Sequence, residues 1–223
     1  MFTNIKAAIF DLDGTLVESM NVWGNIDVNF LVKRGIPAPD DLFEHTAPLN
    51  AIAKAAYFKE NYDINDSIED IVNEFIDMGY KEYSANVRLK DGAKEYLDHL
   101  KSKGIKLSIA TGNTPRLVEA ALKSNDIYNY FDLVVTSDEV NNGKDKPDIY
   151  LHSAKKLKVQ PDECIVFDDI LPAVLGAKLA GMKVIAVYDK YAEHQIEDIK
   201  RNADHFVYNF DELLKGKFCD GDK

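Results

Sequence analysis

The chain of 223 residues is 46% hydrophobic and 29% charged, a composition typical of a globular enzyme built as one large domain or as a core with a smaller inserted domain. Its net charge of −11 argues against nucleic acid or an anionic membrane surface as a partner, so an anionic substrate would need a local positive patch or a metal. Two cysteines without a Cys-x-x-Cys pair exclude a cysteine-built zinc site, and without a long apolar run or signal sequence we expect a soluble cytoplasmic protein.

The first predicted strand, Ile5 to Phe10, ends at a pair of carboxylates. The run is short and apolar on both faces, which is typical of a central strand in a parallel sheet. Ligands of such sheets bind beyond the carboxyl ends of the strands, where the chain places Asp11. The side-chain period of two sends Asp11 and Asp13 to the same side, and Gly14 permits a tight turn. Two close carboxylates repel each other unless a cation or a shared proton relieves them; the structural alternative is a solvated turn.

An all-helical insertion is predicted to follow this strand. Amphipathic periodicity and cap residues predict three helices, from about Met20 to Arg34, Asn50 to Asn61 and Ile68 to Tyr83. No convincing strand lies between Val17 and Asn86. We therefore expect a main domain of residues 1–16 and 89–216, a helical cap domain of residues 17–88, and a frayed tail of residues 217–223.

From Leu89 onward, predicted strands and helices alternate. The strands are Lys106 to Ala110, Phe131 to Val135, Cys164 to Phe167, Val184 to Val187 and His205 to Tyr208; the helices are Asp91 to Lys103, Pro115 to Ser124, Asp148 to Leu157, Pro172 to Ala180 and Asp211 to Lys215. Such alternation is typical of right-handed βαβ units. It predicts an α/β fold in which a parallel sheet lies between two layers of helices.

Polar residues stand at the end of the predicted strand Lys106 to Ala110. Thr111, Gly112 and Asn113 offer a hydroxyl and a backbone N–H beside the start of a helix, which suits a phosphoryl oxygen. A helix-capping turn is the structural alternative. Because the carboxyl ends of parallel strands share one edge of a sheet, we expect these residues to converge with Asp11.

Acidic residues and a lysine complete the candidate site. Asp168 and Asp169 follow a buried strand, and adjacent acids there suit a hard cation with oxygen ligands, above all Mg²⁺; attraction to a helix N-terminus is the alternative. Lys144, in the stretch Gly-Lys-Asp-Lys-Pro-Asp, is placed to neutralise charge shared by carboxylates and a phosphate. Lys146 is the second candidate for that role, and a solvated charged loop is the structural alternative.

The four pieces, in this order and at these strand ends, resemble the four motifs of the haloacid dehalogenase-like (HAD) superfamily, beginning with Asp-Leu-Asp-Gly-Thr-Leu. The resemblance covers essentially the whole chain and implies a Rossmann-like core with an inserted α-helical cap of the C1 type. It implies that Asp11 is the nucleophile, Asp13 the general acid and base, Thr111 a phosphoryl ligand and Lys144 the charge-balancing lysine.

The resemblance also implies a cofactor and a reaction. Mg²⁺ would be held by Asp11, the backbone carbonyl of Asp13, Asp168 and Asp169. The implied reaction is hydrolysis of a small phosphorylated metabolite through an aspartyl phosphate, by a protein that we expect to be a monomer or a weak homodimer.

Residue 23 bears on the choice between two activities of this superfamily. The related β-phosphoglucomutases carry a histidine on the first cap helix where this sequence has Trp23, which favours a phosphatase. Trp23 is a candidate substrate-binding residue on that helix, and packing within the core of the cap is the structural alternative. A β-phosphoglucomutase-like phosphotransferase and a non-catalytic phosphate-binding protein are the alternatives that stay open.

Overall fold

The computed structural model describes residues 4–46 and 49–216, and the chain divides into two compact units. One unit, Met1–Glu18 with Arg88–Lys223, is called the core unit, and the other, Ser19–Val87, is called the helical unit. The frayed tail expected at residues 217–223 lies outside the described residues.

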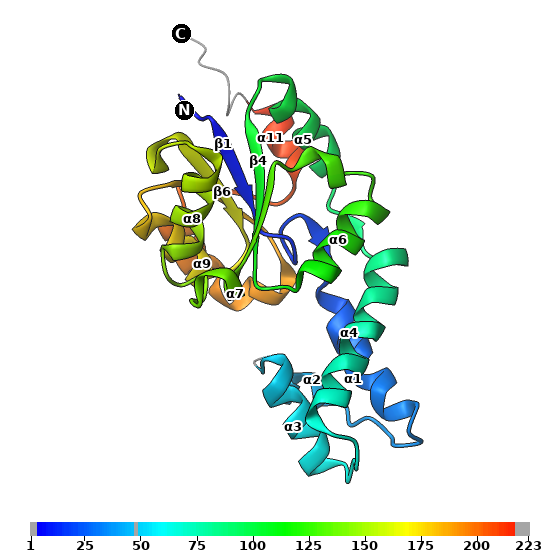
Figure 1. The fold of residues 1–223 in the computed structure, drawn as a ribbon. Coiled ribbons are helices and arrows are strands. Elements are labelled where there is room, and N and C mark those ends of the chain that lie inside the picture. The colour runs from blue at the N-terminus through cyan, green and yellow to red at the C-terminus, as the bar shows by residue number, and fades with distance from the viewer. Residues whose placement is uncertain (1–3, 47–48, 217–223) are drawn as a thin grey trace. The chain divides into compact units, whose positions relative to one another are not determined.

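In the described part of the core unit, six strands form one parallel sheet in the order β5-β4-β1-β6-β7-β8 (Figure 1). These strands are β1 (Ala7–Phe10), β4 (Lys106–Thr111), β5 (Leu133–Thr136), β6 (Cys164–Asp168), β7 (Lys183–Val187) and β8 (His205–Val207). The apolar run of β1 is central and fully buried, as its composition predicts. The predicted α/β fold with a parallel sheet is confirmed.

Helices cover both faces of the sheet. Successive strand residues point to opposite faces, and in β1 the residues on both faces are apolar and buried. On one face, Ala7 and Ile9 pack in a cluster with apolar residues of α8 (Asp148–Leu157), α9 (Leu171–Leu179) and α10 (Ile196–Asn202). Figure 1 shows α8 and α9 on this side of the sheet. On the other face, Phe10 stacks on Phe167 with ring centroids 4.4 Å apart, beside aromatic residues of α5 (Ala93–Ser102) and α11 (Phe210–Lys215). The remaining helical elements of this unit are α6 (Pro115–Ser124), α7 (Ser137–Val140), η1 (Tyr128–Tyr130), η2 (Pro161–Glu163) and η3 (Lys190–Gln195).

A short antiparallel ribbon was not expected from the sequence. Strands β2 (Val17–Glu18) and β3 (Arg88–Leu89) pair with each other, so the expectation of no strand from Val17 onward is wrong at its first two residues. A strand of two residues is too short to show the alternation of apolar and polar residues that predicts a strand. Val17 and Glu18 form one only because they pair with Leu89 and Arg88, which are distant in the sequence. Lys90 anchors the ribbon: its N–H donates to Leu16 O at 3.0 Å, and its buried ammonium lies 3.1 Å from Asp189 Oδ2.

The helical unit contains α1 (Met20–Val32), α2 (Leu42–Thr46), α3 (Ala51–Asn61) and α4 (Ile68–Ala85). Three of these match the predicted helices; the five-residue α2 was missed because it is too short to show helical periodicity. Phe30, Phe58 and Phe75 form an aromatic core between helices. A buried ion pair joins α1 to α3, with Lys54 Nζ donating to both carboxylate oxygens of Asp27 at 3.0 and 2.8 Å.

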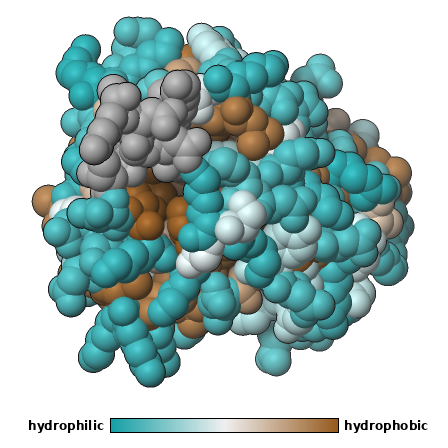
Figure 2. Space-filling view, turned by 90° about the horizontal axis from the view of Figure 1, so that it is seen from above, coloured by the Kyte–Doolittle hydropathy of each residue, from teal (hydrophilic) through white to brown (hydrophobic). Residues whose placement is uncertain are grey.

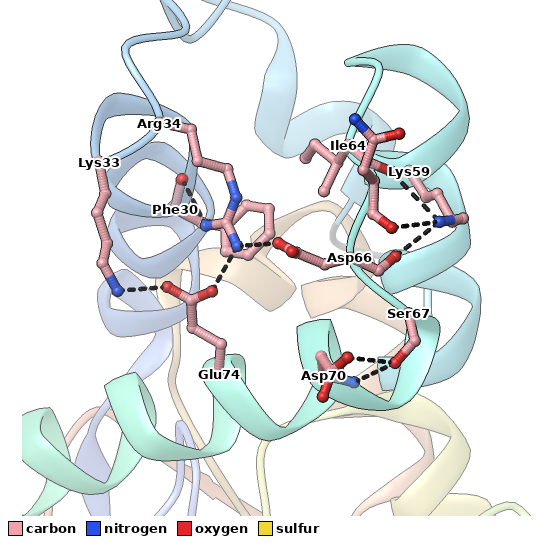
Figure 3. Close-up of polar contacts among 10 residues, drawn as sticks. Phe30, Lys33, Arg34, Lys59, Ile64, Asp66, Ser67, Asp70 and Glu74 are labelled. Carbon is pink, nitrogen blue, oxygen red and sulfur yellow. Dashed lines mark hydrogen bonds and ion pairs between the residues drawn. The ribbon is translucent and has the colours of Figure 1, made fainter.

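Charged side chains tie α1, α4 and the loop between α3 and α4 together (Figure 3). Arg34 donates to Glu74 and to Asp66, each at 2.6 Å. Lys59 donates to the three backbone carbonyls of residues 64–66 at 3.3, 3.3 and 2.7 Å. These contacts hold the loop before α4 through both its backbone and the Asp66 side chain, in addition to the burial of Ile64.

The face of the molecule shown in Figure 2 is largely hydrophilic, with hydrophobic residues in small patches, in keeping with the net charge of −11. Within residues 4–46 and 49–216, none of the helices combines the length and the apolar character that crossing a membrane requires.

Candidate active site

The register of the sheet places acidic residues side by side at its carboxyl edge. Strands β1 and β6 pair with Phe10 opposite Phe167, so the next residues, Asp11 and Asp168, are neighbours. The ladder continues one step further, because the N–H of Asp11 donates to Phe167 O at 2.9 Å. Asp169 follows directly, at the turn into α9.

Three carboxylates meet there in the interior of the protein. Asp11, Asp168 and Asp169 each offer an oxygen, these oxygens lie within 4.8 Å of one another, and all three residues are buried. Lys144 Nζ lies 2.7 Å from Asp11 Oδ1 and also contacts Asp168 Oδ2. Lys146 has a side chain that is 57% exposed and pairs with Asp145 at 3.4 Å, so Lys144 is the lysine at the cluster.

Burial dominates the electrostatics of the cluster. It raises the pKa of Asp11 to about 7 against the opposing pull of Lys144, and it raises the pKa of Asp169 well above its usual range, helped by repulsion from Asp168 and Asp11. Burial alone would lower the pKa of Lys144, but Asp11 and Asp168 outweigh it and raise that pKa well above its ordinary value. Lys144 is therefore a fixed positive charge.

The charges and donor atoms of the cluster fit Mg²⁺. When all three carboxylates are ionised, they and the ammonium of Lys144 carry two net negative charges, which a divalent cation would balance. The donors are all oxygens, and Mg²⁺ prefers oxygen ligands. The side chain of Asp13 is not among the three, and its proposed contribution through the backbone carbonyl stays a prediction.

The turn after β1 holds Asp169 in place. Thr15 Oγ1 donates to Asp169 Oδ1 at 2.8 Å, and both side chains are buried. Gly14 has φ = +83°, and a Cβ there would lie 2.6 Å from Asp169 Oδ2, so glycine is needed both for the backbone conformation and for space. Sequence reasoning missed Thr15, whose only signal is its place directly after Asp13 and Gly14.

At the end of β4, the three predicted substrate-binding residues differ in their surroundings. Thr111 is buried, and its Oγ1 accepts a hydrogen bond from the Asn113 N–H at 3.0 Å, which leaves the hydroxyl hydrogen to donate elsewhere. Gly112 has open space on its Cβ side. The Asn113 amide donates to Asp13 Oδ2 at 2.8 Å, and its oxygen accepts from the Thr114 N–H at 2.7 Å. Asn113 therefore orients Asp13, a role that sequence reasoning did not assign.

Trp23, the remaining predicted site residue, lies on α1 of the helical unit. Its indole N–H donates to the hydroxyl of Tyr83 at 3.2 Å, and Lys54 Nζ lies 6.0 Å from the ring centroid. These contacts join α1 to α3 and α4. The substrate-binding role of Trp23 stays a prediction.

Comparison with known families agrees with this geometry. A family model described as haloacid dehalogenase-like hydrolase matches residues 8–187, which include the carboxylate cluster and both halves of the ribbon. The chain belongs to the haloacid dehalogenase-like hydrolases. The family resemblance expected from the HAD motifs is thereby confirmed.

Individual relatives of this HAD chain carry phosphatase names. It is 31% identical over 183 residues to the bifunctional riboflavin kinase/FMN phosphatase of Arabidopsis thaliana, covering 82% of this chain but only 48% of that protein. It is 31% identical to a phosphorylated carbohydrates phosphatase of Thermotoga maritima, covering 81% of this chain and 84% of that one. A solved structure of a putative β-phosphoglucomutase from Thermotoga maritima aligns with a TM-score of 0.80 and 28% identity, covering 91% and 94% of the two chains.

Replacing Asp169 with asparagine is expected to stabilise the metal-free protein and to remove its response to Mg²⁺. Asparagine replaces a carboxyl whose ionisation is disfavoured by burial and by the charges of Asp168 and Asp11, yet its oxygen still accepts the Thr15 hydrogen bond. Thermal denaturation should give a metal-free Tm at or above that of the wild type. Mg²⁺ at about 100 times its Kd should stabilise the wild type by about 2.7 kcal/mol and leave the variant unchanged.

The control for this experiment is Asp162→Asn, which removes a charge of the same kind from an exposed position in η2. It should respond to Mg²⁺ as the wild type does. If Mg²⁺ stabilised Asp169→Asn as strongly as the wild type, the carboxylate cluster would not be the metal site.

Proposed function

We propose that this HAD-family protein is a Mg²⁺-dependent phosphatase that hydrolyses a small phosphorylated metabolite through an aspartyl phosphate on Asp11. The observation that carries the proposal is the buried Asp11 carboxylate, held 2.7 Å from Lys144 at the edge of an oxygen-only cluster that fits a divalent cation. The phosphatase names of the relatives support the reaction class.

In the first step, a carboxylate oxygen of Asp11 attacks the phosphorus atom of the ester. A bond forms between that oxygen and phosphorus while the bond between phosphorus and the leaving oxygen breaks. Asp13, oriented by Asn113, gives its proton to the leaving alcohol. Lys144 and the Thr111 hydroxyl stabilise the negative charge on the phosphoryl oxygens.

In the second step, water hydrolyses the aspartyl phosphate. Asp13, now ionised, takes a proton from the water as the water oxygen attacks phosphorus. The bond between phosphorus and the Asp11 oxygen breaks, and inorganic phosphate leaves. Both residues return to their starting protonation states, so the cycle is balanced.

Mg²⁺, held by Asp11, Asp168 and Asp169, would supply a Lewis acid that neutralises charge on the phosphoryl group. Under this proposal the helical unit is the cap domain of the fold, and its side chains, Trp23 among them, select the organic part of the substrate.

The experiment that tests the proposal is release of inorganic phosphate from a panel of sugar phosphates, phosphoglycolate, nucleoside monophosphates and p-nitrophenyl phosphate. The assay is run with Mg²⁺ and, in parallel, with EDTA. We expect turnover of at least one ester with Mg²⁺ and none with EDTA. Turnover that EDTA leaves untouched would contradict the metal role, and absence of turnover on every ester would contradict the phosphatase assignment.

A phosphotransferase is the second candidate, favoured by the similarity to the putative β-phosphoglucomutase. It is distinguished by incubating β-glucose 1-phosphate with Mg²⁺ and a catalytic amount of glucose 1,6-bisphosphate. A mutase converts the sugar phosphate into glucose 6-phosphate without releasing phosphate. We expect phosphate release to exceed isomer formation, and the reverse ratio would assign the chain to the mutases.

A further inference from the structure

Lys144 reaches the carboxylate cluster from a loop with no regular secondary structure. The loop lies between α7 and α8, and within it the Lys146 N–H donates to Gly143 O at 3.1 Å. A lysine side chain with four rotatable bonds does not hold its ammonium at one point unless its backbone is fixed. Something outside the loop must therefore set the position of the Lys144 backbone.

Helix α9 supplies that support at a single residue. A Cβ on Gly176 would lie 2.1 Å from Lys144 O, 3.0 Å from Lys146 O and 3.1 Å from the carbonyl carbon of Asp145. The loop backbone thus packs directly on the helix backbone, at a position where any side chain would push it away. Gly176 is helical with ordinary dihedral angles, so space, and not conformational freedom, requires glycine here.

A buried tyrosine hydroxyl links the same two backbones. Tyr150, on α8, donates to Ala173 O of α9 at 3.1 Å and lies 3.4 Å from Lys144 O, so one hydroxyl bridges the helix and the loop. Tyr150 is fully buried, and neither the carboxylate cluster nor the proposed reaction uses its hydroxyl.

Helix α9 also begins directly after the acidic pair. Asp168 is the last residue of β6, and α9 runs from Leu171 to Leu179. Helix α9 is therefore connected at its start to the strand end that presents Asp168, and it also provides the surface on which the Lys144 loop packs. This arrangement fixes the distance between the lysine and the carboxylates that it neutralises.

We propose that Gly176 and Tyr150 are positioning residues for Lys144: the α9 backbone at Gly176 and the Tyr150 hydroxyl of α8 together support the Lys144 loop. This support, called the seat, sets the Lys144 ammonium against Asp11 and Asp168. This inference rests on the proposed function for its kinetic effect, but not for its structural one. The seat acts only through Lys144 and contributes no group to the reaction.

The test compares Gly176→Ala with Gly181→Ala. The first variant moves the Lys144 loop by about 1 Å, and it should lower kcat on the best ester of the panel roughly 10- to 100-fold with little change in KM. Gly181, just beyond the end of α9, has φ = +77° and no atoms near its Cβ position. Alanine there strains the backbone but leaves the loop alone, so kcat should stay within about twofold of the wild type.

A double-mutant cycle separates a positioning role from general damage. In a Lys144→Met background, Gly176→Ala should lower kcat no further, because its only route to the reaction has been removed. An equal loss in both backgrounds would overturn the proposal. If Gly176→Ala does not fold, Tyr150→Phe replaces it in the cycle, with an expected loss of about 2- to 10-fold.

A crystal structure of Gly176→Ala distinguishes failure of the seat from failure of the phosphatase assignment. We expect the distance from Lys144 Nζ to Asp11 Oδ1 to exceed the 2.7 Å of the wild type. If the lysine is displaced in the variant but the wild type hydrolyses no ester, the positioning role of Gly176 is supported and the phosphatase assignment is rejected. If the lysine keeps its place in the variant, the seat is refuted whatever the activity.

Discussion

Asp11→Asn should abolish phosphate release, lowering kcat by roughly 10³-fold or more, because the amide oxygen of asparagine is a poor nucleophile. The fold should survive the change. Burial already raises the pKa of Asp11 to about 7, so this position tolerates a neutral side chain, and Lys144 keeps Asp168 as a partner. Phosphate release and thermal denaturation measure the two effects, and Asp162→Asn serves as the exposed control.

The same residue should carry the covalent intermediate. Borohydride reduces an acyl phosphate to an alcohol, so trapping the wild type during turnover should convert Asp11 into homoserine, detectable by mass spectrometry of the peptide that contains it. Reduction at another carboxylate, or full activity in Asp11→Asn, would assign the nucleophile to a different residue.

Lys144→Met should impair both activity and stability, whereas Lys146→Met should do neither. Loss of Lys144 leaves Asp11 and Asp168 buried without a counter-charge, and breaking a buried ion pair from one side costs about 3 kcal/mol or more. Lys146 is 57% exposed and pairs only weakly with Asp145, so its replacement should change the free energy of unfolding by less than about 0.5 kcal/mol. Chemical denaturation of the metal-free proteins measures both values.

The cost of Lys144→Met should depend on pH in a defined direction. A carboxyl whose pKa is raised by folding stabilises the protein below its unfolded pKa, and that stability is lost as the pH rises through the folded pKa. For Asp11 the folded pKa is about 7, and removing Lys144 raises it further. The destabilisation should therefore be large at pH 8 and smaller at pH 5.5. A cost that is equal at both pH values would show that the carboxylates are not responsible.

The sequence predicted those elements whose boundaries depend on neighbouring residues along the chain. The helices Pro115–Ser124 and Asp148–Leu157 begin and end where the sequence predicts, because proline, acidic and apolar residues stand at the expected positions. The convergence of Asp11 with Asp168 and Asp169 follows from parallel pairing, because the C-terminal ends of all strands in a parallel sheet lie at the same edge. The periodicity of apolar residues along the sequence, together with the apolar character of the strands, therefore predicted most of the fold and the acidic part of the site.

What the sequence could not predict depends on distant contacts. The two-residue strands of the ribbon exist only as a pair, and α10 is short and highly charged, so neither shows periodicity. Lys144 and Lys146 stand two residues apart in one loop, and only the packing of that loop decides which ammonium points inward. The requirement for glycine at position 176 comes from the backbone of that same loop.

The division of the chain into two units affects how such a protein can change over generations. Among the described residues, the three carboxylates of the cluster, Lys144, Thr111 and Asn113 all belong to the core unit. Mutations in the helical unit therefore leave these residues themselves unchanged. After gene duplication, one copy can acquire a new substrate while inheriting the old catalytic apparatus intact.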